Sequence, residues 1–359
     1  MTRVDDRYAT AERFTTLRGI EREARRQLSE VAWNYLHCGT GDEVTLRDNT
    51  AAFDRLRFST PLFAGITNPE TATRVLGHEL SFPAYVAPFG GGEALFHPEG
   101  HLAVARAAAA EGIRQMVPVA AAHSLETVAA ASPAPAIFQV TFVGEEEAVL
   151  QLIGRARDAG YTHICVTYSP IRQWRERMTE DRFTVRGETG PANFGPGLSD
   201  PAALAEQLDF TRPRWNWEQA ARVMAASPLP CIVKGVTSAR DAEAALRAGA
   251  AGLYVSNYGG RSIDRMPAAI ETLAEVRRAA GNDVPIVFDS GIRRGSDIAM
   301  ALALGADAVA LGRTVALGLA ADGEAGVRAV LRILRQEFWT TLGHLGCSRV
   351  SELGPHVLC

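Results

Sequence analysis

The sequence predicts an α/β fold, a (β/α)8 TIM barrel with an N-terminal helical extension and a long loop after the fourth barrel strand. Short apolar runs rich in Val, Ile and Ala alternate with alanine-rich stretches whose apolar residues recur at helical spacing. This alternation is typical of parallel strands joined by helical crossovers, and strands that are apolar throughout are buried on both faces. Eight such units close most simply into a barrel. The eight runs are residues 83–87, 115–117, 136–140, 163–168, 230–234, 252–256, 284–289 and 307–311.

The remaining elements follow from the segments around these runs. Residues 1–81 are predicted to be a helical cap and lead-in, in which 12–38 carry an apolar stripe and are expected to close the bottom or side of the barrel. Residues 82–359 then form the barrel itself. The polar segment 171–214, rich in Arg, Gly and Pro, is predicted to be a lid loop. The clearest helical patterns cover residues 102–111, 145–159, 239–248 and 295–304.

A doubly wound parallel sheet is the competing architecture. That fold normally carries a G-x-G-x-x-G turn after its first strand. Residues 87–93 instead read Ala-Pro-Phe-Gly-Gly-Gly-Glu, which is a different loop, so the barrel is favoured.

Composition narrows the possible partners. Acidic residues number 41 and basic residues 37, for a net charge of −4, which argues against a nucleic-acid partner. No run approaches the roughly 18 apolar residues of a membrane span. The five cysteines show no C-x-x-C pairing, and the first residues are polar, so we expect a reducing compartment, a cytoplasmic location and no metal site.

The loops after the strands carry the chemistry in a barrel of this kind. Glycine turns with arginines follow the last two runs, at 289–295 and 311–313, and indicate a phosphate site, because backbone N–H groups and guanidiniums bind anions. Ordinary tight turns with solvated arginines are the alternative.

Lys234, the one lysine of the chain, ends a buried run, where its charge is costly unless it meets an anion. It suits the electron-rich edge of a reduced flavin, and a lysine extending into solvent is the alternative.

A family resemblance becomes visible after the sixth run. The chain resembles the FMN-dependent 2-hydroxy acid oxidases and dehydrogenases (the glycolate oxidase, lactate oxidase and mandelate dehydrogenase types) over about residues 12 to 353. This resemblance implies FMN at the mouth of the barrel, accepting a hydride from the α-carbon of the substrate. The matching stretches are Pro98-Glu99-Gly100, Val233-Lys234-Gly235 and residues 256–264, 291–297 and 319–327.

The resemblance also implies roles for individual residues. Positions that match the family's flavin contacts are expected to bind FMN noncovalently through the backbone of the first loop, the flavin ring, the ribityl chain and the phosphate. Arginine and tyrosine side chains are expected to bind the substrate carboxylate, for which the planar guanidinium is well suited. The expected FMN residues are Pro88, Phe89, Gly90, Gln139, Lys234, Ser256, Asp289, Gly291, Arg293, Gly312 and Arg313, and the expected substrate residues are Tyr35, Thr141, Arg175 and Arg261.

The chain departs from the family pattern around the reacting carbon. The family's catalytic histidine corresponds to Tyr258, and the aspartate that orients this histidine corresponds to Tyr168. A second active-site tyrosine corresponds to Thr141, a serine near the flavin to Pro118, and a strand threonine to Val166. None of the eight histidines falls at the carboxyl end of a run, where this architecture needs its base, so Tyr258 is the candidate catalytic residue.

Three functions are compatible with this pattern. The first is oxidation at a carbon bearing nitrogen, as in an amino acid or amine derivative, because a neutral amine can expel hydride without a strong base. The second is 2-hydroxy acid oxidation with Tyr258 as the base, although the pKa of a phenol, ~10, makes it a weak base at neutral pH. The third is a catalytically degenerate flavin-binding protein. We expect an oxidoreductase, with O2 as a possible electron acceptor and a homotetramer as the assembly that the resemblance implies.

Overall fold

Eight parallel strands close into a barrel in the computed structural model, which describes residues 13–90, 92–133, 137–142, 144–168, 174–182, 192–194 and 215–359. Around the barrel the strands follow the order β10-β3-β4-β5-β6-β7-β8-β9, so the last strand meets the first. This confirms the predicted (β/α)8 barrel, and each of the eight predicted runs overlaps a strand. The strands are β3 (Ala84–Val86), β4 (Arg114–Pro118), β5 (Ile137–Thr141), β6 (His163–Thr167), β7 (Cys231–Val236), β8 (Gly252–Val255), β9 (Ile286–Phe288) and β10 (Ala308–Leu311).

The barrel closes where β10 pairs with β3, with Val309 opposite Ala84. Side chains on both faces of these strands are buried, which explains their unbroken apolar sequences. One irregularity interrupts the ring: the register of β7 against β8 shifts between Lys234 and Val236. Gly235 lies at this bulge with a φ of 110°, a backbone conformation that glycine adopts without strain.

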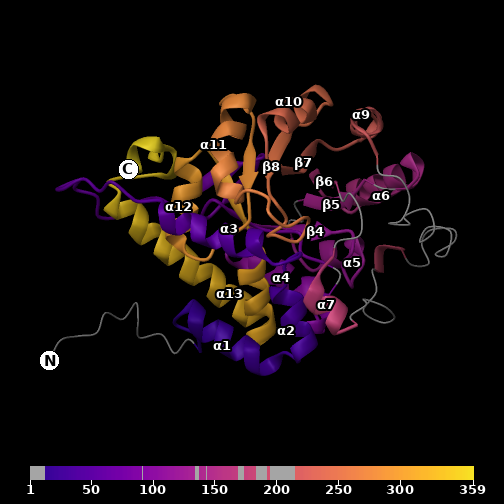
Figure 1. The fold of residues 1–359 in the computed structure, drawn as a ribbon, viewed down its shortest axis with the longest axis horizontal. Helices are drawn as coiled ribbons and strands as arrows, with labels where there is room; N and C mark the ends of the chain where they lie inside the picture. Colours follow the sequence, from indigo (N-terminus) through magenta and orange to yellow (C-terminus); the bar gives the residue numbers. More distant parts are fainter. Residues whose placement is uncertain are drawn as a thin grey trace.

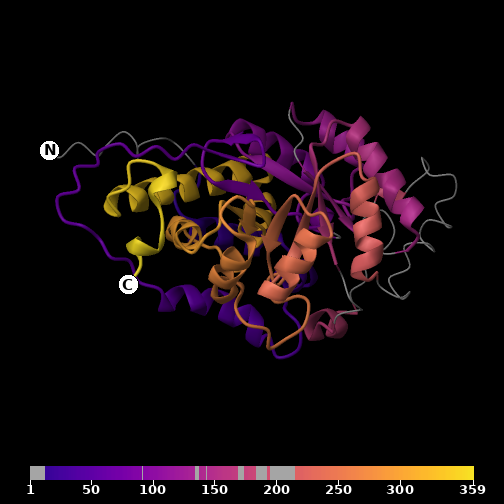
Figure 2. The ribbon, with the colours of Figure 1, turned by 90° about the horizontal axis from the view of Figure 1, so that it is seen from above.

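Helices follow the strands and cover the outside of the barrel (Figures 1 and 2). Ser124, Asn216 and Ser238 cap three of them by accepting a hydrogen bond from a backbone N–H of the first turn. The last helix contains a kink at Asp322 and Gly323, whose dihedral angles are not helical. The outer helices are α4 (Gly100–Ala110), α5 (Leu125–Ala130), α6 (Glu146–Asp158), α9 (Trp217–Ala226), α10 (Ala239–Arg247), α11 (Ala269–Ala280), α12 (Gly295–Ala303) and α13 (Arg313–His344).

Three helices precede the barrel: α1 (Leu17–Gln27), α2 (Glu30–His37) and α3 (Val44–Arg55). Thr16 and Ser29 cap the first two through their hydroxyl groups. In Figure 1, α1 and α2 lie along α13, and α1 therefore covers the side of the barrel as expected. The carboxyl end of α2 reaches the mouth, where Tyr35 and Leu36 line a cavity, so this part of 12–38 does not close the bottom.

A short hairpin closes the bottom of the barrel instead. Its strands are β1 (Thr73–Val75) and β2 (His78–Leu80), which pair antiparallel. Tyr85 of β3 donates a hydrogen bond from its hydroxyl to the backbone oxygen of Val75, over 2.8 Å. The sequence analysis did not predict this hairpin, because its three-residue strands are too short to show an alternating pattern.

Between α3 and β1 the chain forms an extended arm, residues 59–68. Every residue of the arm except Ile66 is exposed, and Leu62 and Phe63 are the most exposed large apolar side chains of the described residues. Figure 2 shows this arm projecting at the left of the molecule.

Most of the predicted lid, 171–214, lies outside the described residues. Two short pieces of it are described, α7 (Glu176–Glu180) and the 3-10 helix η4 (Ala192–Phe194). The other 3-10 helices are η2 (Glu93–Leu95), η5 (Val350–Glu352) and η6 (Pro355–Val357).

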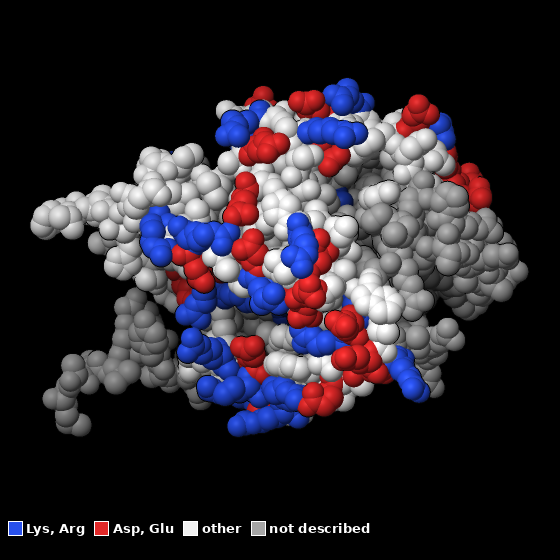
Figure 3. Space-filling model, viewed as in Figure 1, with Lys and Arg blue, Asp and Glu red and all other residues white. Residues whose placement is uncertain are grey.

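On the face shown in Figure 3, arginines and acidic side chains intermingle without a broad field of one sign. Among the described residues, no helix is long and apolar enough to span a membrane.

Candidate active site

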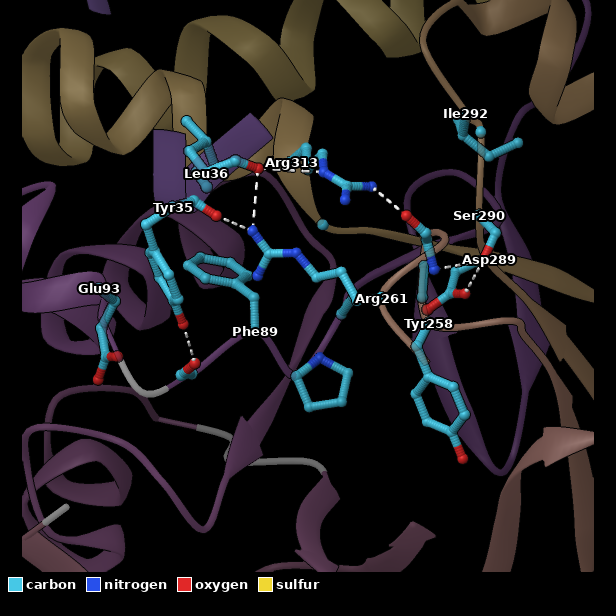
Figure 4. Close-up of a pocket in the computed structure, with 18 of the residues that line it drawn as sticks. Tyr35, Leu36, Phe89, Glu93, Tyr258, Arg261, Asp289, Ser290, Ile292 and Arg313 are labelled. Atoms are coloured by element: carbon cyan, nitrogen blue, oxygen red, sulfur yellow. Dashed lines mark hydrogen bonds between the residues drawn. The ribbon is translucent and has the colours of Figure 1, made fainter. Parts of the chain in front are cut away.

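The mouth of the barrel contains two adjoining cavities, of about 260 and 240 Å³. Loops at the carboxyl ends of the strands and the end of α2 line them, as expected for a site in this fold. Pro88, Gly90, Arg175, Lys234 and Tyr258 line both cavities, so these residues lie along their boundary. Figure 4 shows the larger cavity.

Lys234 and Asp289 form a buried ion pair at the floor of the larger cavity, with 2.6 Å between Nζ and Oδ2. Tyr254 and Ser290 each donate a hydroxyl hydrogen bond to the carboxylate over 2.8 Å, and Ser256 donates another. Burial alone would raise the pKa of Asp289, but Lys234 and the hydroxyl donors lower it below its ordinary value. Lys234 therefore meets an anion inside the protein, and not solvent.

The far end of the larger cavity is built from two loops that precede helices. Gly312 is the N-terminal cap of α13, and Gly291, with a φ of 108°, lies in the loop after β9. A Cβ on Gly291 would lie 2.1 Å from the backbone oxygen of Asn49, so only glycine fits this position. Arg293 lines the same end, and burial lowers its pKa. The helix N-terminus and the half-buried guanidinium of Arg293 make this end suitable for a phosphate.

Two arginines converge on the carboxyl end of α2. Arg313 donates from Nε to the oxygen of Leu36 over 3.1 Å and from Nη2 to the oxygen of Cys38 over 3.1 Å. Arg261 contacts the oxygens of Tyr35 and Leu36, and its guanidinium lies over the Tyr35 ring. Burial lowers the pKa of Arg313, and so do the charges of Arg261 and Arg293. Within the described part of the chain, neither Arg261 nor Arg313 forms an ion pair, so an anion entering the cavity would relieve this repulsion.

Tyr35 and Arg175 complete this cationic wall. The hydroxyl of Tyr35 donates to the backbone oxygen of Gly90 over 2.7 Å, and burial raises its pKa. Arg175 precedes α7 as its N-terminal cap residue, and burial, followed by the charge of Arg261, lowers its pKa. The structure thus brings together three of the predicted substrate residues, Tyr35, Arg175 and Arg261.

Tyr258 lies in a left-handed backbone conformation, with a φ of 58°. Its hydroxyl lies 2.8 Å from the backbone oxygen of Tyr168 and 3.1 Å from that of Lys234, and both are acceptors. A Cβ on Gly235 would lie 2.1 Å from this hydroxyl, so the bulge in β7 provides the space that the phenol occupies. Burial raises the pKa of Tyr258, and the nearby Cys165 and Asp289 raise it further. Figure 4 shows the ring directed away from Arg261 and Tyr35.

The smaller cavity is lined by Gln139, Thr141, Pro118 and Tyr168. The amide of Gln139 donates to the hydroxyl of Thr141 over 3.3 Å. Val166, the other departure from the family pattern, is buried within β6. The substituted positions other than Val166 therefore line one space next to Lys234, as their positions at neighbouring strand ends predict.

The structure gathers the predicted residues at the mouth, but in different ways. Ser256 does not line either cavity and acts through its hydrogen bonds to Lys234 and Asp289. The backbone oxygen of Phe89 accepts a hydrogen bond from Nε2 of His101 over 2.7 Å, so a side chain of α4 holds the loop after β3 in place. The other predicted FMN residues line one cavity or both, namely Pro88, Phe89, Gly90, Gln139, Lys234, Asp289, Gly291, Arg293, Gly312 and Arg313.

Sequence reasoning missed two polar residues of the site. Ser290 has a φ of 82°, and its hydroxyl accepts hydrogen bonds from the backbone N–H groups of Asn257 and Gly259. It therefore connects the loops after β8 and β9. Glu93 lines the larger cavity beside Tyr35 and is almost fully buried. Its position in the loop after the first barrel strand was the available signal, because that loop faces the mouth in a TIM barrel.

The barrel, the cationic cavity and the buried Lys234–Asp289 pair define a class of protein: a barrel oxidoreductase that binds a phosphorylated flavin beside an anionic ligand. A model of the FMN-dependent dehydrogenase family matches residues 24–359. The chain belongs to that family, and FMN is its cofactor.

Individual relatives agree with this assignment. Glycolate oxidase of Spinacia oleracea is 36% identical over 354 residues, covering 95% of this chain and 94% of that protein. Glycolate oxidase 1 of Zea mays is 38% identical over 341 residues, covering 92% of this chain and 91% of that protein. A crystal structure of mandelate oxidase superposes with a TM-score of 0.88 at 34% identity and covers 96% of this chain and 98% of that one. The chain is thus a 2-hydroxy acid oxidase-like oxidoreductase.

The residues present fit FMN. The helix N-terminus at Gly312 with Arg293 would hold the phosphate, and Lys234 would face the flavin ring from the boundary of the two cavities. The close approach at Gly291 leaves the backbone of that loop available to a ligand without an intervening side chain.

Proposed function

We propose that this protein oxidises the α-carbon of a carboxylate substrate at a carbon–nitrogen bond, as in an amino acid or an amine derivative. The main observation behind this proposal is the position of Tyr258. Its hydroxyl lies within hydrogen-bonding distance of the backbone oxygens of Tyr168 and Lys234 and donates to them. Burial raises the pKa of this phenol, so it is not poised to accept a proton near neutral pH. Among the described residues that line the two cavities, none is a histidine.

The chemistry of the two substrate classes differs in its need for a base. An alcohol must lose its hydroxyl proton as hydride leaves the α-carbon, which requires a base poised near the working pH. An amine in its neutral form already has a lone pair that can form the carbon–nitrogen double bond. A site without such a base therefore favours the amine, while solvent or buffer deprotonates the ammonium before the oxidation.

The side chains of the larger cavity have separable roles in this proposal. Arg261 and Arg175 bind the substrate carboxylate, with Tyr35 beside them, because planar guanidiniums pair well with carboxylates. Lys234 places a positive charge at the edge of the flavin and is itself held by Asp289. FMN, when bound, supplies the hydride acceptor.

Oxidation of a 2-hydroxy acid, with Tyr258 as the base, is the second candidate. The observation in its favour is the similarity to glycolate oxidases and mandelate oxidase, whose names indicate hydroxy acids. The two candidates predict opposite preferences between a 2-amino acid and the matching 2-hydroxy acid.

The deciding experiment is anaerobic mixing of the FMN-loaded protein with matched 2-amino and 2-hydroxy acids, following the loss of flavin absorbance. Reduction by amino acids at rates at least about tenfold above those of the hydroxy acids supports the proposal. Faster reduction by the hydroxy acids contradicts it. Tyr258→His, tested in the same assay, shows whether hydroxy acid oxidation returns when the family's histidine is restored.

We also propose O2 as the electron acceptor, a cytoplasmic location and a homotetramer. The five cysteines are all free thiols, which supports a reducing compartment. The exposed Leu62 and Phe63 on the arm support a contact with a second copy of the chain, because large apolar side chains seldom project together into solvent. Sedimentation of the purified protein measures the assembly, and oxygen consumption during turnover measures the acceptor.

A further inference from the structure

Glu93 is a buried carboxylate at the edge of the larger cavity. It begins η2, directly after the glycine-rich loop that follows β3, and it is 1% exposed. Figure 4 shows it on the side of Tyr35 opposite to Arg261. The cavity therefore has a cationic wall of arginines on one side of Tyr35 and a carboxylate on the other.

Two backbone groups hold this carboxylate. Gly92 donates its N–H to Oε2 over 3.2 Å, and Ala122 donates its N–H to Oε1 over 2.5 Å. Within the described residues, no Lys, Arg or His lies within 4 Å of it as an ion-pair partner. Because removing an ionised carboxylate from water is costly unless a cation compensates for it, two N–H donors offset only part of this cost.

Among the described residues, the ionisable side chains around Glu93 form no ion pair with it. His101 faces the oxygen of Phe89 through Nε2 and the amide of Gln115 through Nδ1, an arrangement that suits the neutral ring, and burial lowers its pKa. His123 approaches the same spot, since a Cβ on Gly100 would lie 3.1 Å from Cγ of Glu93 and 3.7 Å from Nδ1 of His123. That nitrogen is buried without a hydrogen-bond partner. Tyr35 remains as the neutral neighbour.

We infer that Glu93 is the binding subsite for a positively charged nitrogen of the substrate, whose carboxylate lies at Arg261 and Arg175. The inference rests on the proposed function only for the placement of the carboxylate. A carboxylate beside the α-nitrogen would keep that nitrogen protonated and oppose its oxidation. The nitrogen at Glu93 is therefore a second one, beyond the α-carbon, and the substrate class is a carboxylate with a basic side chain.

The test uses ligands that cannot be oxidised at the α-carbon by either proposed reaction, so its result does not depend on turnover. The FMN-loaded protein is titrated with 4-aminobutyrate, 6-aminohexanoate and 8-aminooctanoate, and with butyrate, hexanoate and octanoate as partners that lack the amino group. Binding is followed by the change in flavin absorbance or by calorimetry. At one chain length or more, the amino compound is expected to bind about tenfold tighter than its partner.

Glu93→Gln is expected to abolish this preference, while the unsubstituted carboxylates still bind and FMN is retained. Glu99→Gln, at an exposed carboxylate in an ion pair with Arg106, is the matched control and is expected to keep the preference. A wild-type protein without any preference, or without measurable binding of any probe, overturns the inference, even if Glu93→Gln fails to fold. A preference that survives in Glu93→Gln also overturns it.

The binding test is independent of the proposed carbon–nitrogen oxidation. Reduction of the flavin by 2-hydroxy acids alone would contradict that oxidation and leave the binding result intact.

Discussion

At the scale of single residues, the site depends on which buried polar groups have partners. Lys234 and Asp289 compensate each other, and the hydroxyl of Tyr258 is satisfied by two backbone oxygens. The sequence predicted that Lys234 needs an anion, because a buried ammonium is costly. It did not predict the partner of Tyr258, because that contact depends on the bulge at Gly235, which has no signature beyond one glycine in a strand.

Removal of the ammonium is expected to destabilise the protein strongly. In Lys234→Met the carboxylate of Asp289 keeps only hydroxyl donors, and the free energy of unfolding is expected to fall by about 3 kcal/mol. Lys234→Met with Asp289→Asn is expected to recover most of this loss, because no unpaired charge remains buried. Urea denaturation of the flavin-free proteins measures both effects without a contribution from FMN binding. Simple additivity of the two single substitutions would contradict the coupling.

Tyr258→Phe separates a structural phenol from a catalytic one. If the hydroxyl only donates to backbone oxygens, its loss costs about 1 kcal/mol of stability and changes the rate of flavin reduction by no more than about fivefold. If Tyr258 is the base, the rate is expected to fall by roughly 10²- to 10⁴-fold. Stopped-flow reduction and thermal unfolding of the same preparation distinguish the two outcomes. We expect the smaller effect.

At the scale of elements, α7 and α2 position the carboxylate-binding side chains. Arg177 of α7 forms a bidentate ion pair with Glu43, and Asn34 of α2 donates to Asp181 over 3.0 Å. Arg175 immediately precedes α7, so these contacts fix its backbone. Sequence periodicity predicted the helix that carries Tyr35 but not the contact with α7, because the contacting residues are more than 130 positions apart.

Loss of the α7 contact is expected to weaken substrate binding more than stability. Arg177→Ala frees α7 from the segment before α3 and is expected to raise the KM for a carboxylate substrate about fivefold, while the pair, being partly exposed, contributes about 1 kcal/mol or less to stability. Arg222→Ala is the matched control, since it removes an Arg–Glu ion pair between α6 and α9 whose residues line neither cavity. An equal effect of both substitutions on KM would show that the position of α7 does not matter for binding.

At the scale of the whole molecule, the barrel was predictable and its bottom closure was not. Each barrel strand and the helices α4, α6, α10 and α12 follow apolar patterns that are visible in the sequence. The hairpin β1–β2 has three-residue strands and therefore no pattern to detect. The arginines of the mouth were predictable by position, but their backbone partners on α2 lie over 200 residues away and follow only from barrel closure.

Two half-buried histidines predict how the fold responds to acid. Burial lowers the pKa of His37 at the end of α2 and of His78 in the bottom hairpin to about 4 each. The unfolded chain binds these protons near pH 6.5, whereas the folded protein does not, so stability is complete above about pH 6.5 and falls as the pH decreases toward 4. His78→Gln is expected to make this decline in melting temperature shallower. The same change at the exposed His356 is expected to leave the slope as it is.

The closure of the barrel also sets when the protein can first hold its cofactor during synthesis. The wall of the larger cavity joins Leu36, near the start of the chain, to Arg313, 277 positions later. A ribosome therefore releases most of the polypeptide before the two halves of the pocket can meet. A nascent chain that ends before Gly312 lacks both Gly312 and Arg313, so this part of the cavity wall forms only after their synthesis.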